Sequence, residues 1–123
     1  MPLRGLGNMK RLKKFLEENH RVKILPPASK YFKKLKDDHL KNLFFEAIKL
    51  ILENPLIGEE KHGDLRGIRS YDIYYKKVNY ELSYSVFFEN EELVVVIMAG
   101  PRENFYDDLK RYLRSQQRQI GGR

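Results

Sequence analysis

Arginine, lysine and tyrosine are the side chains with which this 123-residue sequence could do chemistry, since 24 residues are Lys or Arg, eight are Tyr and none is Cys. Metal-free cleavage of RNA needs a base for the 2′-hydroxyl, a fixed cation for the phosphorane charge and an acid for the leaving 5′-oxygen. Arg, Lys and Tyr can divide these tasks, and aromatic rings can stack on unpaired bases. A cluster of Arg and Tyr at strand ends would therefore qualify as a nucleic-acid site.

Other kinds of chemistry have little support in the sequence. Without Cys there is no disulfide, thiolate zinc site or cysteine nucleophile. His20, His39 and His62 are too scattered for a metal-binding pair, and each is expected on the surface or in a turn rather than as a base. The phosphate-binding glycine motifs and G-x-S-x-G are also missing. We therefore expect no metal and no small-molecule cofactor.

Positive charge is concentrated at the two ends of the chain. The net charge is +7, but residues 1–41 carry twelve basic against four acidic side chains, and residues 110–123 carry five against none. Residues 42–109 carry seven basic against thirteen acidic side chains. Clustered positive charge favours a polyanionic partner such as nucleic acid, or an acidic protein, because it raises the local anion concentration. A surface that only aids solubility is the alternative.

The length and apolar content indicate one folded domain in a soluble protein. A chain of 123 residues with 41% hydrophobic residues can bury one core. Its longest apolar run, residues 93–98, is far shorter than the roughly 20 residues that a membrane span needs. We expect no membrane contact and a cytoplasmic location.

Helical periodicity dominates the first half of the sequence. Apolar residues recur at a spacing of three or four, which predicts a short basic helix over 9–19 and two further helices over 28–36 and 39–53. Between the first two, residues 22–25 alternate apolar and polar side chains before two prolines, which predicts a short strand.

From residue 69 the period changes to two. The alternation predicts strands over 69–76 and 80–88, and an unbroken apolar run predicts a buried strand over 93–98. Asn104 is placed to cap a last helix whose apolar face extends to Leu113. Helices followed by strands predict an α+β fold with the helices on one face of the sheet: a helical hairpin packed on a small antiparallel sheet, and a C-terminal helix. Four tyrosines are expected to face this core: Tyr71, Tyr75, Tyr80 and Tyr84.

Several motifs, in the same order along the chain, give a family resemblance. The segments HGDLRGIR (62–69), YELSYSV (80–86) and LVVVIMAGPRENFYDDLKRYL (93–113) resemble the RelE/ParE superfamily of toxins from type II toxin–antitoxin systems. VKILPPASKYFKKL (22–35) and LENPLIG (52–58) are similar to that family's first strand and helix and to its link into the sheet. The resemblance covers roughly residues 21–113.

The resemblance implies a domain organisation, a function and partners. It implies a RelE-like domain over residues 21–114, preceded by an N-terminal extension over 1–20 with a short basic helix and followed by a flexible basic tail over 115–123. It implies a toxin that inhibits translation as a metal-free endoribonuclease, cutting messenger RNA in the ribosome. Its partners would then be the ribosome, messenger RNA and a cognate antitoxin.

Candidate site residues follow from matching the family's motifs. Arg102 matches the arginine after the last strand and would stabilise phosphate charge, with a surface arginine as the alternative. Tyr106 matches the aromatic residue that follows this arginine in the family. It would position the RNA or protonate the leaving oxygen, with a packing role as the alternative. Arg69 is the third candidate catalytic residue. Six basic residues are candidates for RNA binding: Arg66, Lys76, Lys77, Lys30, Lys33 and Lys34.

Two departures from the family pattern weigh against cleavage. Glu81 stands where RelE-like nucleases carry an arginine, and Asp72 and Tyr74 stand where they carry lysines. A carboxylate cannot cradle phosphate as an arginine does, so the positive charge would have to come from the strand ends. The alternatives are a ParE-like or degenerate member that binds a protein such as gyrase without cleaving RNA, and a nontoxic RNA-binding module.

Overall fold

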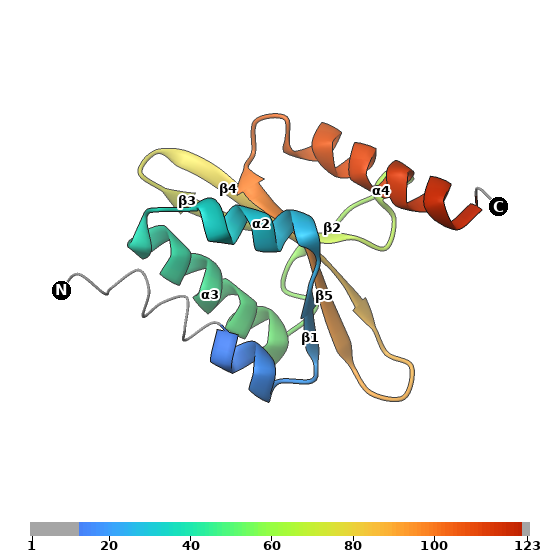
Figure 1. Cartoon of the computed structure of the whole chain (residues 1–123), viewed down its shortest axis with the longest axis horizontal. Helices are drawn as coiled ribbons and strands as arrows, with labels where there is room; N and C mark the ends of the chain where they lie inside the picture. Colours follow the sequence, from blue (N-terminus) through green and yellow to red (C-terminus); the bar gives the residue numbers. More distant parts are fainter. Residues whose placement is uncertain (1–12, 122–123) are drawn as a thin grey trace.

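A computed structural model describes residues 13–121 and consists of a five-stranded sheet with helices on both of its faces (Figure 1). Residues 13–18 are helical. The later elements are β1 (Val22–Ile24), α2 (Pro26–Lys34), α3 (Asp38–Glu53), β2 (Glu59–Glu60), the 3-10 turn η1 (Gly63–Leu65), β3 (Arg69–Tyr75), β4 (Val78–Phe87), β5 (Leu93–Pro101) and α4 (Phe105–Gly121). No helix among the described residues is both long enough and apolar enough to span a bilayer.

The starts of the two hairpin helices follow from local sequence signals. Pro26 lies in the first turn of α2, where its missing N–H has no partner to lose. The Asp37 carboxylate caps α3 and accepts hydrogen bonds from the backbone N–H groups of His39 (3.0 Å) and Leu40 (3.1 Å). The predicted helices over 28–36 and 39–53 are therefore confirmed to within two residues.

The sheet has the order β1-β5-β4-β3-β2. β3, β4 and β5 pair antiparallel, as the alternation predicted. β1 adds to β5 in parallel, with Val22 opposite Val94, and the two-residue β2 adds antiparallel to β3. The sheet is thus mixed rather than wholly antiparallel. β1 forms one edge of the sheet, and the helices and strands between β1 and β5 supply the long connection that parallel pairing needs.

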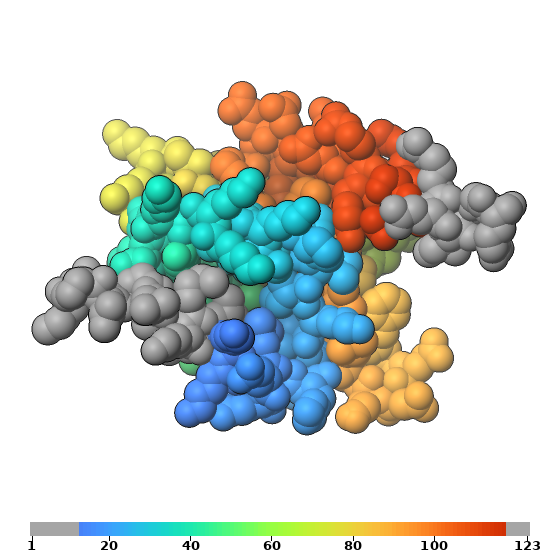
Figure 2. Space-filling view, in the orientation of Figure 1, coloured from blue at the N-terminus to red at the C-terminus, as the bar shows by residue number. Residues whose placement is uncertain are grey.

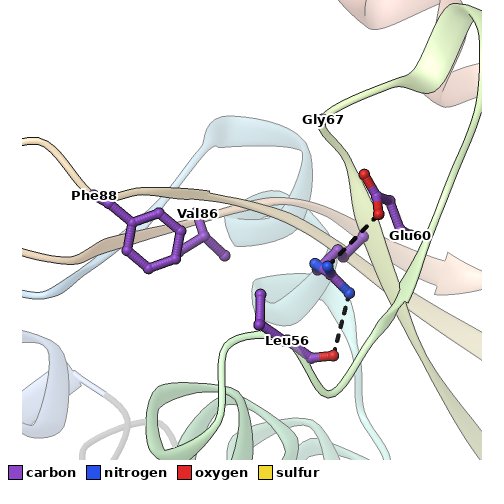
Figure 3. Close-up of a pocket in the computed structure, with 6 residues that line it drawn as sticks. Leu56, Glu60, Gly67, Val86 and Phe88 are labelled. Atoms are coloured by element: carbon purple, nitrogen blue, oxygen red, sulfur yellow. Dashed lines mark hydrogen bonds and ion pairs between the residues drawn. The ribbon is translucent and has the colours of Figure 1, made fainter.

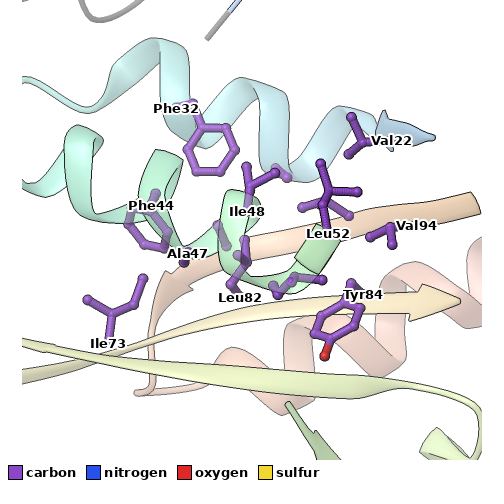
Figure 4. Packing of buried hydrophobic residues seen from close by; sticks show 14 of the residues in the cluster. Val22, Phe32, Phe44, Ala47, Ile48, Leu52, Ile73, Leu82, Tyr84 and Val94 are labelled. Atoms are coloured by element: carbon purple, nitrogen blue, oxygen red, sulfur yellow. The ribbon is translucent and has the colours of Figure 1, made fainter. Parts of the chain in front are cut away.

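The larger core lies between the sheet and the hairpin of α2 and α3 (Figure 4). Phe32 and Phe44 pack at 5.4 Å between ring centroids, above Leu82 and Tyr84 of β4. Tyr71, Tyr75 and Tyr80 pack at the edge of this cluster, so the expected core orientation of the strand tyrosines is confirmed. Phe15 of the 13–18 helix also packs on it; the predicted helical residues 9–12 lie outside the described residues.

α4 covers the opposite face of the sheet, which corrects the expectation that all helices share one face. Along β5, Val94 and Val96 contact the α2–α3 core, whereas Val95 and Ile97 contact a second cluster with Phe105. Successive strand residues point to opposite faces, so the two clusters lie on opposite sides. The second cluster also contains Leu65, Ile68 and Leu109.

α4 continues to Gly121, eight residues past Leu113, where the apolar pattern ends. Residues 115–121, the described part of the predicted flexible tail over 115–123, continue this helix. Gln and Arg dominate the sequence of this tail, and both are good helix formers even without an apolar face.

Candidate functional site

A buried carboxylate, Glu81, lies at the centre of the α4-facing side of the sheet. It is fully inaccessible to solvent and lies in the middle of β4, opposite Asp72 on β3 and Gly100 on β5. The Ser70 hydroxyl donates a hydrogen bond to its Oε1 at 2.6 Å, and the Tyr106 hydroxyl donates to the same oxygen at 2.9 Å. A buried charge without such partners would be strongly unfavourable.

Arg102 closes the network from the other side. Its Nε donates to Glu81 Oε2 at 2.6 Å, and its Nη2 donates to Asp72 Oδ2 at 3.0 Å. The residue follows β5 directly, and its backbone N–H bonds to the carbonyl oxygen of Asn79 at 2.8 Å. The guanidinium is half exposed but is shared between two carboxylates, whose charges compensate its own.

Tyr106 is held in the first turn of α4 by contacts on both sides of its ring. Phe105 packs against it edge to face at 5.2 Å, and Lys61 Nζ lies 5.0 Å from the ring centroid. Lys61 is itself paired with Glu59 at 2.8 Å. Tyr106 therefore packs against Phe105 and also donates a hydrogen bond to Glu81.

The proton affinities of these groups reflect their contacts. Burial alone would raise the pKa of Glu81, but its neighbours Asp72, Ser70, Arg102 and Tyr106 together hold that pKa below its ordinary value. The pKa of Asp72 is raised by burial and by the Glu81 carboxylate beside it. Burial raises the pKa of the Tyr106 phenol. The hydrogen bond between Arg102 and Glu81 raises the pKa of the Arg102 guanidinium. These directions describe an ionised Glu81 whose surroundings are organised to keep it charged.

Arg69, the third candidate catalytic residue, lies elsewhere. Its guanidinium donates to the Gly58 carbonyl oxygen at 2.7 Å. It also donates to the Leu56 carbonyl oxygen at 3.2 Å and lies 3.7 Å from Glu60, the two contacts that dashed lines mark in Figure 3. In the alternation of β3 it shares a face with Tyr71, whereas Ser70 and Asp72 face α4. The structure brings Arg102 and Tyr106 together around Glu81, but it does not bring Arg69 to them.

The six candidate RNA-binding residues are exposed in three places. Lys30, Lys33 and Lys34 lie on α2, Lys76 and Lys77 form the β3–β4 turn, and Arg66 follows η1. None of them takes part in the hydrogen bonds around Glu81.

Two contributors to the network were not identified from the sequence. Ser70 and Lys61 belong to no recognised motif. The sequence could have pointed to Ser70 only through strand pairing, because pairing β3 with β4 in register places Ser70, Asp72 and Glu81 on one face. Within residues 13–121, no group of three His, Asp or Glu side chains is placed to hold a metal ion.

Comparison with known proteins gives one family and one similar fold. Residues 22–110 match the family described as the ParE-like toxin of type II bacterial toxin–antitoxin systems. A chain in the crystal structure of the intact E. coli RelBE toxin–antitoxin complex is similar in fold, with a TM-score of 0.52 and 24% sequence identity. The similarity covers 67% of this chain and 95% of that chain, which confirms the predicted RelE-like α+β fold. No curated protein matches the sequence.

Proposed function

Because the chain belongs to the family of ParE-like toxins of type II bacterial toxin–antitoxin systems, we propose that it acts in the cytoplasm by binding a protein target and not by cutting RNA. We also propose that a cognate antitoxin binds the chain and keeps it inactive until the antitoxin is removed. The crystal structure of the similar E. coli chain contains a toxin–antitoxin complex, which supports an antitoxin as the partner.

The state of Arg102 carries this proposal. Metal-free cleavage needs a fixed cation whose charge is available to the phosphorane in the transition state. Arg102 is already bound by Glu81 at 2.6 Å and by Asp72 at 3.0 Å. A phosphate would have to bind the donors that remain on the guanidinium, where its attraction is already offset by the Glu81 and Asp72 carboxylates. Otherwise it would have to take the cation from a fully buried carboxylate, which costs far more than breaking a surface pair.

Tyr106 supports the same reading. A general acid has to present its proton to the leaving oxygen. The Tyr106 proton is directed at Glu81 Oε1, and burial raises the pKa of this phenol further above neutrality. The network around Glu81 therefore has the features of a structural support for α4 and the end of β5.

The resemblance to ParE toxins suggests DNA gyrase as the protein target. Expression of the chain in a host is expected to arrest growth without producing transcript ends at fixed positions within codons. The purified toxin is expected to inhibit supercoiling by gyrase in vitro. Transcript ends positioned within codons, together with normal supercoiling, would instead establish the messenger RNA cleavage predicted from RelE-like members.

A neutral pair of substitutions tests the role of Arg102 directly. The Glu81→Gln/Arg102→Gln double variant removes both charges but keeps side chains that can hydrogen-bond. We expect it to arrest growth like the wild type when its melting temperature shows that it is folded. Loss of toxicity in the folded double variant would show that the cation acts in the toxic step. Glu46→Gln/Lys49→Gln, which neutralises an ion pair on α3 (3.7 Å) with about half-exposed side chains, removes the same two charges and serves as the control.

A further inference from the structure

The turn between β3 and β4 carries lysine at two positions that ordinarily take other residues. Tyr75 and Val78 are paired across the hairpin, so Lys76 and Lys77 alone form the loop. Their φ angles are +51° and +66°, both in the left-handed region. A two-residue loop with positive φ at both positions favours Asn-Gly, since side chains with a Cβ and a long stem are strained there. The sequence thus keeps two cations at a cost in stability.

The turn is fixed against the link between α2 and α3. The Tyr75 hydroxyl donates to the two Asp37 oxygens at 3.0 and 3.2 Å, and Lys76 Nζ lies 4.0 Å from Asp37. These contacts place the turn beside the lysines that end α2, and Figure 2 shows the two segments side by side at one end of the molecule. We call this surface the lysine corner; its exposed cations are Lys33, Lys34, Lys36, Lys76 and Lys77.

Acidic side chains only partly offset this charge. Asp37 and Asp38 are the acidic residues of the α2–α3 link, and Asp37 is occupied in capping α3 and in binding Tyr75. Arg102 and its two carboxylates belong to a separate network on the α4-facing side of the sheet. The lysine corner therefore has a positive excess that faces solvent.

Aromatic rings border the lysines. Tyr74 precedes the turn and is 67% exposed, although a large aromatic ring is ordinarily better covered. On the other side of the strand, the Tyr75 ring is occupied, because the His39 ring stacks on it at 5.4 Å between centroids and Lys76 Nζ lies 5.3 Å from its centroid. Tyr74 is therefore the ring available to a base. Lysines that follow a backbone and rings that accept bases are the features of sites for single-stranded nucleic acid.

We propose that the lysine corner binds a single strand of nucleic acid that passes round the β3–β4 turn, with the lysines on the phosphates and Tyr74, on the α4-facing side of β3, stacked on a base. The inference goes beyond the proposed protein target and does not depend on it. The lysines can follow the repeated phosphates of a strand while Tyr74 stacks on a base, which is why nucleic acid is the favoured partner. An acidic protein segment would meet the same lysines, and poly-glutamate tests that alternative.

The test measures affinity and stability on the same variants. Full-length protein is titrated with a 20-nucleotide oligo(U) RNA, oligo(dT) DNA of the same length, a 20-base-pair DNA duplex and poly-glutamate over a range of salt concentrations. We expect one or both single strands to bind more tightly than the duplex and poly-glutamate. Lys76→Asn/Lys77→Gly should weaken this binding and lower the slope of log affinity against log salt by roughly 1.4, about 0.7 for each lost phosphate contact.

Because Asn-Gly suits the turn, the same variant should also melt higher than the wild type by about 5 °C. A gain in stability with a loss of binding cannot come from unfolding. Lys76→Gln/Lys77→Gln should lose the binding without the gain in melting temperature. Tyr74→Ala should weaken single-strand binding about tenfold, with the salt slope unchanged.

Lys23→Gln/Lys49→Gln removes the same charge from β1 and the exposed side of α3 and should change the affinity by less than about twofold. Three outcomes would overturn the proposal: unchanged binding in the Asn-Gly variant, equal loss in the control pair, or poly-glutamate bound as tightly as the single strands. Preference between the RNA and DNA oligonucleotides identifies which single strand the corner takes. Transcript mapping and supercoiling assays test the proposed function separately, so either proposal can fail alone.

Discussion

The two faces of the sheet are built on different principles. The face under α2 and α3 is covered by a continuous apolar cluster of fifteen buried residues. The face under α4 has five buried apolar residues and, beside them, a fully buried glutamate with its hydrogen-bond partners. β5 contributes branched apolar residues to both faces. The difference in polarity between the two faces therefore comes from β3, β4 and the helices.

This difference separates stability from positioning. Apolar burial stabilises in proportion to the area removed from water and tolerates small shifts. A buried charge with four polar neighbours contributes little net stability but accepts only one arrangement of them. The α2–α3 face therefore holds the fold together, whereas the α4 face fixes where the end of β5 and the start of α4 lie.

Truncation of the large core should have the greatest effect. Phe44→Ala removes a ring that is 1% exposed and packs on Phe32, Tyr31 and Tyr80, so we expect a loss of about 3–5 kcal/mol in the free energy of unfolding by urea denaturation. Phe105→Ala on the α4 face should cost less, because its smaller cluster can relax. An equal or larger cost for Phe105→Ala would contradict the division between the faces.

The next largest effect should come from Glu81→Leu. It leaves the Ser70 and Tyr106 hydroxyls without their buried acceptor, which should cost about 2–3 kcal/mol. Ser70→Ala/Glu81→Leu/Tyr106→Phe removes donors and acceptor together and should recover most of the loss. If urea denaturation of the triple variant shows it to be less stable than Glu81→Leu alone, the network stabilises the fold more than we infer.

Tyr84→Phe should have an intermediate effect on the apolar face. The Tyr84 hydroxyl donates to the Pro55 carbonyl at 2.7 Å and accepts from the Gly58 N–H at 2.8 Å. A Cβ at position 58 would lie 2.7 Å from this oxygen, so only glycine allows the approach. Loss of the hydroxyl should cost about 1–2 kcal/mol. Tyr75→Phe, at the edge of the same cluster, is the control and should cost less in the same denaturation experiment.

The smallest effect is expected at Asp72 and depends on pH. Its pKa in the folded protein lies above the ordinary value of 3.8, so the folded state binds this proton more tightly than the unfolded state. Stability from this group is present below pH 3.8 and is lost as pH rises through the raised pKa. Asp72→Asn should therefore raise the melting temperature at pH 7 by about 2 °C, a difference that disappears below pH 4. A lower melting temperature at pH 7 would show that the pair with Arg102 outweighs repulsion from Glu81.

The fold was predictable where the sequence repeats a pattern. Strands β3 to β5 and helices α2 and α3 each present a regular apolar face, so periodicity located them. β2 consists of two exposed glutamates and exists only because β3 offers an edge, so no local signal marks it. The position of α4 depends on β5, whose alternate residues contact α2 and α3 on one face and α4 on the other. Because all residues of this strand segment are apolar, its sequence pattern does not reveal two separate faces.

The candidate site was predictable in part. Matching the family's motifs located Arg102 and Tyr106 and identified Glu81 as a reversed charge. That these residues bond to one another depends on the strand register and on the orientation of α4, since Glu81 is 21 residues from Arg102 and 25 from Tyr106. Ser70 gave no signal because serine is ordinary in a half-exposed strand.

The parallel pairing of β1 with β5 has a consequence for biosynthesis. Val22 meets Val94 only after about 70 further residues have been made, which takes the ribosome roughly 4–14 s. Until then β1 has no partner strand, and the apolar side of α2 has no β5 to pack against. Such non-local contacts slow folding. The β1 edge of the sheet can therefore form only once β5 has been made and has left the ribosome.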